Sequence, residues 1–182
     1  EEAKPYTRRE MDMLVSTHNR LGEAYYRKEN YLDAEQEFQQ VKQLYEEAKS
    51  RNMLGPSREF GRIYANLGDL YYYVSNDYDT ALNLYENAED NSYSTDKLHY
   101  KKGFIMYNKS DYSDALSEFY ESAAPFSENE NLLYSTGNTL FRRGDYFAAQ
   151  GYYNHLLDLL EKRKSEIPYL LPEEQKEHRA LL

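Results

Sequence analysis

The chain has 182 residues, of which 30% are charged and 15% aromatic, and a formal net charge of −10. This length suits one domain or an array of small repeated units. No apolar stretch approaches the ~20 residues that cross a bilayer, and the negative charge disfavours general affinity for nucleic acid. The absence of cysteine excludes disulfides and thiolate metal sites, and it leaves cytoplasm and bacterial periplasm equally open as compartments.

Local signals divide the chain into helices. Capping-box patterns begin at Thr7 and at Ser127, each with a glutamate three residues later. Proline and glycine separate other segments, as at Gly55-Pro56 and Ala124-Pro125. A further helix, 172–182, is predicted to cap the C-terminal end of the array. The other predicted helices are 8–28, 31–52, 57–74, 78–90, 95–109, 112–124, 128–143 and 146–166.

Four of these helices carry a glycine at matched phase, Gly22, Gly68, Gly103 and Gly137, separated by 46, 35 and 34 residues. A tyrosine, an alanine and an aromatic residue follow Gly22, Gly103 and Gly137 at the same intervals. Around Gly68 the intervals are one residue longer, which predicts an extra residue in the turn 75–77. Glycine inside a helix costs about 1 kcal/mol relative to alanine. We therefore expect close helix–helix approach at these points, opposite the repeated alanines Ala34, Ala81, Ala115 and Ala149.

The pattern over residues 8–166 resembles the tetratricopeptide repeat (TPR) family. Leu21-Gly22 and Leu67-Gly68 match its Leu-Gly pair, whereas Lys102-Gly103 and Thr136-Gly137 make the third and fourth repeats degenerate. The resemblance implies an all-α fold, a right-handed α-α superhelix with a C-terminal capping helix, as one domain over 1–182. Its repeats would span 8–52, 57–90, 95–124 and 128–166. The first glycine interval exceeds 34 residues by twelve, so the second and third helices should project beyond the others.

Catalytic chemistry has no candidate residues in this sequence. No nucleophile motif, phosphate-binding loop or dinucleotide fingerprint is present. His18 and His99 lie four residues before a repeat glycine, where a packing role is expected, and His155 and His178 lack a second histidine at metal-ligand spacing. We therefore predict no catalytic residue, no metal site and no cofactor.

The first helix of each pair lines the concave face of a TPR array, so positions counted from each glycine predict a binding wall. This wall combines aromatic, amide and basic side chains, which together can grip peptide backbone and carboxylate groups. Tyrosines that fill gaps between repeats are the alternative interpretation of the same periodicity. The predicted groove residues are Asn19, Tyr26, Arg27, Arg62, Asn66, Tyr72, Tyr73, Lys97, Tyr100, Lys101, Tyr107, Tyr134, Asn138 and Arg142.

Part of the wall resembles the two-carboxylate clamp with which some TPR domains hold acidic C-terminal tails. Asn66, Lys97 and Lys101 match that clamp, whereas Asn19 and Glu23 depart from it. A carboxylate at Glu23 would repel an incoming carboxylate. The resemblance implies anion binding at the three matching positions, and thus a protein or peptide partner with acidic or C-terminal carboxylate groups.

We predict a non-catalytic scaffold that binds a protein or peptide segment in its concave groove. Two alternatives remain open at this point. The long second and third helices and the stripe 156–160 suit self-association within a larger assembly, such as a bacterial envelope or flagellar machine. Tyrosines beside arginines also suit single-stranded nucleic acid, although the net charge disfavours it.

Overall fold

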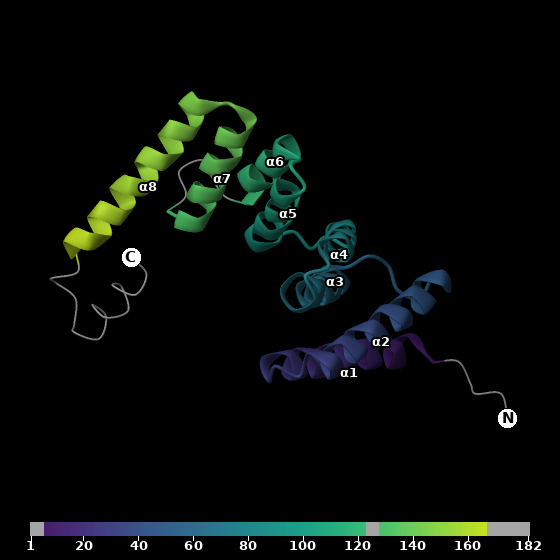
Figure 1. The fold of residues 1–182 in the computed structure, drawn as a ribbon. Coiled ribbons are helices and arrows are strands. Elements are labelled where there is room, and N and C mark those ends of the chain that lie inside the picture. Colours follow the sequence, from purple (N-terminus) through teal and green to yellow (C-terminus); the bar gives the residue numbers. More distant parts are fainter. Residues whose placement is uncertain (1–5, 123–127, 167–182) are drawn as a thin grey trace. The chain divides into compact units, whose positions relative to one another are not determined.

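The computed structural model describes residues 6–122 and 128–166, which form antiparallel helix pairs (Figure 1). Every regular element within these ranges is helical, so the predicted all-α fold class is confirmed. The predicted helix 172–182 lies outside the described residues. The helices are α1 (Arg8–Arg27), α2 (Tyr31–Ser50), α3 (Arg58–Leu70), the π-helical turn η1 (Tyr71–Ser75), α4 (Tyr78–Asp90), α5 (Asp96–Asn108), α6 (Tyr112–Ser122), α7 (Glu130–Arg143) and α8 (Tyr146–Glu166).

Side-chain caps explain where several of these helices begin. Thr7 accepts a hydrogen bond from the Glu10 backbone N–H, while the Glu10 carboxylate accepts one from the Thr7 N–H at 2.8 Å. This is the predicted capping box. At α7 the cap is Asn129, whose side chain accepts from the Leu132 N–H, and Ser127 lies outside the described residues. Within the described residues, each of the eight helices predicted there is present and starts within two residues of its expected position.

The extra residue of the second repeat lies inside a helix, which corrects the prediction that it extends the turn 75–77. Residues 71–75 form the π-helical turn η1, which ends at Asn76 in the left-handed conformation with φ of 54°. A π turn spans one residue more than an α turn. The helix therefore takes up the insertion by widening, and Tyr72 and Tyr73 lie within the widened turn.

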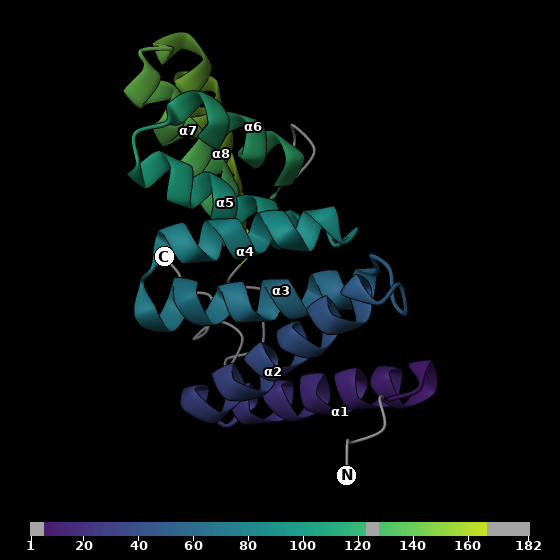
Figure 2. The same cartoon turned by 90° about the vertical axis from the view of Figure 1, so that its right-hand side faces the viewer.

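The chain forms two compact units, Glu1–Ser94 and Thr95–Leu182, with two helix pairs in each. Figure 2 shows α1 beside α2 and α3 beside α4 in unit 1. In the core of this unit the buried Tyr45 ring stacks on Phe60 at 3.8 Å, and its hydroxyl donates to Asn91. In unit 2, Phe119 and Leu132 are buried together. A single domain over 1–182 stays a prediction.

A ring of the second helix lies against the repeat glycine in each of the four pairs. A Cβ atom added to Gly22, Gly68, Gly103 or Gly137 would lie 2.7–2.8 Å from a ring carbon, closer than packed carbon atoms approach. The expected close helix approach is therefore confirmed. The contact differs from expectation, because the aromatic residue rather than the alanine covers the glycine. The four rings belong to Phe38, Tyr85, Phe119 and Tyr153, in repeat order.

Each helix pair also carries a polar cross-link of one of two kinds, and the kind alternates along the chain. In the first and third pairs a histidine meets a glutamate, at 2.5 Å for His18–Glu37 and 2.8 Å for His99–Glu118. In the second and fourth pairs the phenol of the covering ring donates to the residue after the glycine, at 2.8 Å for Tyr85–Asp69 and 2.8 Å for Tyr153–Asn138. The two histidines thus join the helices of a pair by a hydrogen bond as well as by packing. Each unit contains one pair of each kind.

Replacing a repeat glycine by alanine should destabilise the protein. In Gly103→Ala the new methyl group would meet the Phe119 ring at 2.7 Å and the Ala115 carbonyl oxygen at 3.2 Å. Overpacking of this kind costs about 1–3 kcal/mol and exceeds the gain in helix propensity. We expect a net loss of about 1–2 kcal/mol in the free energy of unfolding, measured with urea.

Gly151→Ala is the matched control, because Gly151 lies inside α8 and a Cβ there would meet nothing within 4 Å. This variant should be up to about 1 kcal/mol more stable than the wild type. If Gly103→Ala were stabilised to the same extent, the ring would not cover Gly103.

Alkaline pH should destabilise unit 1. Burial and the nearby Glu46 carboxylate raise the pKa of Tyr64 to about 12, and burial raises the pKa of Tyr45 and of Tyr85. A phenol whose pKa is higher in the folded state contributes stability that is complete below the unfolded value near 10 and is lost as pH rises through the folded value.

Urea unfolding at about pH 8 and about pH 11.5 measures this loss, on the order of 2 kcal/mol for Tyr64 alone. In Tyr64→Phe the decrease between the two pH values should be smaller by that amount. An equal decrease in the two proteins would show that Tyr64 is not held as a buried phenol.

Candidate functional site

Unit 2 contains a cavity of about 200 Å³ between α5, α6 and α7. Four of the predicted groove residues, Tyr100, Tyr107, Tyr134 and Asn138, line it together. The periodicity of the sequence thus placed residues from two helices on one concave surface. The complete lining is Tyr100, Phe104, Tyr107, Phe119, Asn131, Tyr134, Ser135 and Asn138.

Helical spacing explains how the wall of this cavity is built. On α5, Tyr100, Phe104 and Tyr107 lie at i, i+4 and i+7, and on α7 the lining residues follow the same spacing. Phe119 of α6 is buried, and its ring lies 5.7 Å from the Tyr100 ring. Because the Phe119 ring also covers Gly103, the contact that closes the helix pair supplies part of the lining.

Some polar groups of the cavity form hydrogen bonds with neighbouring side chains. The hydroxyl groups of Tyr100 and Ser135 lie 3.2 Å apart, and the Asn138 Oδ1 atom accepts from Tyr153 at 2.8 Å. The amide nitrogen of Asn138 can therefore still donate to a ligand. The pKa of Tyr153 is raised by burial and by the neighbouring Tyr134 and Tyr107, so its phenol keeps the proton that it donates.

Cationic side chains lie beside the cavity, although none of its described lining residues is charged. Lys97 and Lys101 are on the face of α5 that carries Tyr100 and Phe104, and Lys97 is exposed. On α7 the exposed Arg142 donates a hydrogen bond to Tyr107, which raises the pKa of the Arg142 guanidinium. An uncharged aromatic cavity with cations beside it favours neutral or acidic ligands.

On the corresponding surface of unit 1, more of the aromatic rings pack against one another. Tyr72 lies 4.7 Å from Tyr73 and 5.5 Å from Tyr78, measured between ring centroids, and is half-buried. Burial, with the Asp69 charge as a weaker cause, raises the pKa of Tyr26. Tyr73 is 56% exposed. Packing thus accounts for part of this aromatic set, and Tyr73 remains accessible to a ligand.

Two predicted ligand-binding residues of unit 1 contact an acidic side chain of the same unit. Arg62 lies 3.5 Å from the Glu23 Oε1 atom, and the Asn66 amide donates to the same oxygen at 3.3 Å. Arg27 is exposed. Glu23 already provides a carboxylate to Arg62 and Asn66. The wall of unit 1 therefore has less capacity to bind an acidic ligand than its residue types suggest. The clamp formed by Asn66, Lys97 and Lys101 stays a prediction.

Asn19 is the one predicted groove residue that the structure places inside the protein. Its exposed fraction is 0%, so it cannot contact a ligand in this conformation, and its assignment to the groove is corrected. The physical reason is its position one helical turn before Gly22, on the side of α1 that Phe38 approaches closely.

Four lining residues were absent from the predicted set, namely Phe104, Phe119, Asn131 and Ser135. The spacing of three and four residues around Tyr100 and Tyr134 could have identified Phe104, Asn131 and Ser135. Phe119 is different, because it belongs to the second helix of its pair. Its position in the repeat marked it as a packing residue, which it also is.

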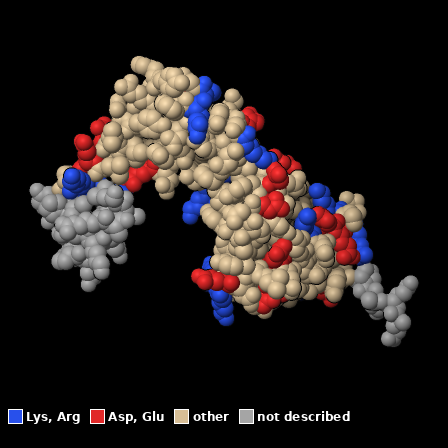
Figure 3. All heavy atoms as spheres, in the orientation of Figure 1, with Lys and Arg blue, Asp and Glu red and all other residues tan. Residues whose placement is uncertain are grey.

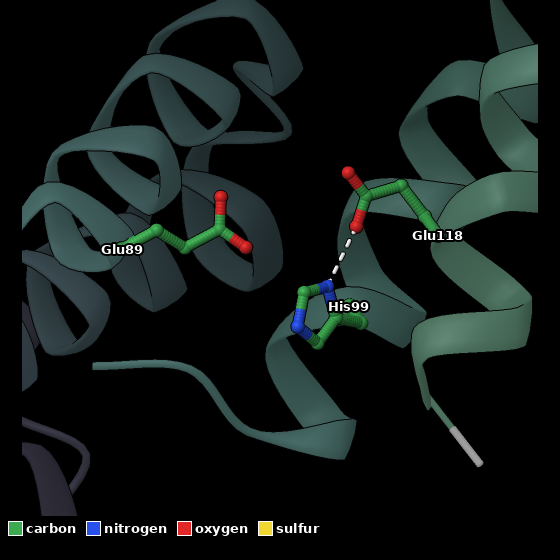
Figure 4. A group of neighbouring side chains, drawn as sticks. All are labelled: Glu89, His99 and Glu118. Atoms are coloured by element: carbon green, nitrogen blue, oxygen red, sulfur yellow. Dashed lines mark hydrogen bonds and ion pairs between the residues drawn. The ribbon is translucent and has the colours of Figure 1, made fainter. Parts of the chain in front are cut away.

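The histidines of the first and third pairs are engaged within the protein. The Glu118 carboxylate accepts from His99, as Figure 4 shows, and its other oxygen lies 2.6 Å from the Lys102 ammonium group. Lys102 is only 5% exposed. A metal ion bound by His99 and Glu118 would therefore lie beside a buried cation, which disfavours metal binding by these two residues.

Repeated helix pairs, each closed on a glycine, and a concave cavity built by their first helices define the class of α-helical repeat scaffolds. The tetratricopeptide repeat family profile matches residues 65–131. A crystal structure of MamA is similar, with a TM-score of 0.62 and 16% identity over 87% of this chain and 89% of that one. A second MamA structure has a TM-score of 0.54 and 13% identity, covering 88% and 100% respectively. No curated protein sequence matches significantly.

The family profile thus covers residues 65–131, and the fold of the described residues is that of a TPR solenoid. This fold is that of a protein-interaction scaffold in general, and TPR proteins are generally non-catalytic. The partners that the fold indicates are proteins. In the part of the chain that the structure describes, no helix has both the length and the apolar character to cross a membrane.

Proposed function

We propose that the chain binds a protein or peptide segment on the face formed by the first helices of unit 2, α5 and α7, with the unit 2 cavity as the centre of the contact. The observation that carries this proposal is the convergence of Tyr100, Tyr107, Tyr134 and Asn138 on one cavity. These residues come from two different repeats, so the surface exists only because the helix pairs stack.

The size of the cavity suits part of a chain molecule. Its volume of about 200 Å³ is below the roughly 300 Å³ at which pockets for whole small molecules begin. It can take one large side chain. Burying such a side chain contributes about 1.5–3 kcal/mol, while the amides of Asn131 and Asn138 can hydrogen-bond the adjoining peptide backbone.

Exposure of the tyrosines supports the same interpretation. Tyr134 is 56% exposed although it lines the cavity. A ring that only filled a gap between repeats would be buried. Exposed aromatic rings at the centre of a concave surface are typical of the residues that dominate binding energy.

Random peptides displayed on phage, selected against the full chain and then synthesised with a fluorescent label, test the proposal. Tyr134→Ala should weaken binding of the selected peptides about tenfold or more, because truncation removes an aromatic contact. The control is Phe147→Ala, because Phe147 is 90% exposed and lies on α8, away from the cavity lining.

Phe147→Ala should leave the affinity unchanged, and circular dichroism should show the same helix content in both variants. Selected peptides whose affinity is indifferent to Tyr134→Ala would contradict the proposal, since they would bind elsewhere. Failure to select any peptide would contradict it as well.

A further inference from the structure

We infer that the unit 2 cavity preferentially binds an aromatic side chain flanked by acidic residues. We assign this preference to unit 2 and not to the first helices of unit 1. The inference rests on the proposed function and names the chemistry of its ligand. The ligand needs no chain terminus, because the ring enters the cavity and the carboxylates of acidic side chains meet the cations beside it.

The aromatic rings that line the cavity are compatible with two classes of ligand. Four aromatic rings from α5 and α7, those of Tyr100, Phe104, Tyr107 and Tyr134, line it with Phe119 of α6. Such a surface can bind an apolar or aromatic group through burial and ring–ring contact. It can equally bind a cation over the ring faces. The charges near the cavity must decide between the two.

The charges on α5 and α7 exclude a cationic ligand. The two helices that carry most of the lining, α5 and α7, contain five lysines and arginines, of which Lys102 is paired with Glu118 and Arg143 with Asp145, and two carboxylates. One of the two, Glu130, is bound by Arg163 of α8 at 3.0 Å. The other, Asp96, is the first residue of α5, a helical turn before Tyr100. A cationic ligand would therefore approach Lys97 and Arg142, which are both exposed on these helices.

A cluster of carboxylates in unit 2 lies on α6, the other helix of the third pair. Between Tyr112 and Ser122, α6 carries three acidic residues and no basic one, and one of them, Glu118, is bound by His99 and Lys102. Figure 3 shows one face of the molecule, on which uncharged side chains predominate over α7 and charged side chains lie toward the C-terminal end of α8. The first helices of unit 2 therefore combine an uncharged aromatic cavity with adjacent positive charge.

Unit 1 lacks this combination, which is why the preference is assigned to unit 2. There Glu23 lies against Arg62 and Asn66, and Asp69, on α3 with both of them, accepts from Tyr85. Carboxylates of unit 1 therefore lie among the polar side chains of its first helices. An acidic peptide at Arg62 would therefore lie beside the Glu23 carboxylate and be repelled by it.

Three blocked peptides, fluorescently labelled and titrated against the full chain, test the inference. The first has a central phenylalanine flanked by aspartates, the second has alanine in place of phenylalanine, and the third has lysines in place of the aspartates. We expect the first to bind about tenfold tighter than the alanine peptide, because one buried ring accounts for at least that factor. It should also bind tighter than the lysine peptide, because the lysines would approach the like charges of Lys97 and Arg142. Its affinity should fall with added salt.

Two variants locate the preference, with a matched control. Tyr134→Ala should abolish the preference for phenylalanine over alanine, and Arg142→Gln should reduce the preference for aspartate over lysine at least threefold. Arg27→Gln, which removes an arginine of unit 1 that is also exposed, should change neither. Equal effects of Arg142→Gln and Arg27→Gln would overturn the assignment to unit 2.

Tighter binding of the lysine peptide would overturn the inference in favour of cation recognition by the rings. Equal binding of the phenylalanine and alanine peptides would also overturn it, because the cavity would then not read a ring. Either result would leave the proposed function standing if the phage-selected peptides still depended on Tyr134. Loss of that dependence would remove both.

Discussion

The contact on which this structure depends is an aromatic ring packed on the backbone of a glycine. It occurs once in each helix pair, with Phe38, Tyr85, Phe119 or Tyr153 covering the glycine of the preceding helix. A side chain in place of the glycine hydrogen would keep the two helices apart. Burial of a ring contributes about 1.5–3 kcal/mol. The four contacts therefore stabilise four helix pairs, each of which is too small to fold alone. They also set the rotation of each first helix, and thereby which residues face the concave side.

The polar cross-links divide the chain in the same way as its compact units. Unit 1 and unit 2 each begin with a histidine–glutamate pair and continue with a phenol bound to the residue after the glycine. The units differ where a ligand would bind. Glu23 compensates Arg62 in unit 1, whereas in unit 2 the cavity is uncharged and Lys97 and Arg142 lie beside it. Two units with one architecture thus present different surfaces.

Much of the fold could be predicted because its determinants are local and periodic. The glycine spacing gave the repeats, and caps such as Thr7 gave helix starts to within two residues. The π-helical turn could not be predicted, since a one-residue insertion fits a turn or a widened helix equally well in sequence. Burial of Asn19 and the Glu23–Arg62 contact depend on side-chain packing between helices. Periodicity specifies the face of a helix, but it does not specify what covers that face.

The most direct test of the central claim is a nuclear Overhauser spectrum of the full chain, assigned at the four repeat glycines and the four covering rings. The account predicts cross-peaks from the Hα protons of Gly22, Gly68, Gly103 and Gly137 to ring protons of Phe38, Tyr85, Phe119 and Tyr153 respectively, because each ring lies in contact with its glycine. Glycine Hα protons with cross-peaks only to aliphatic side chains of the neighbouring helix would contradict it.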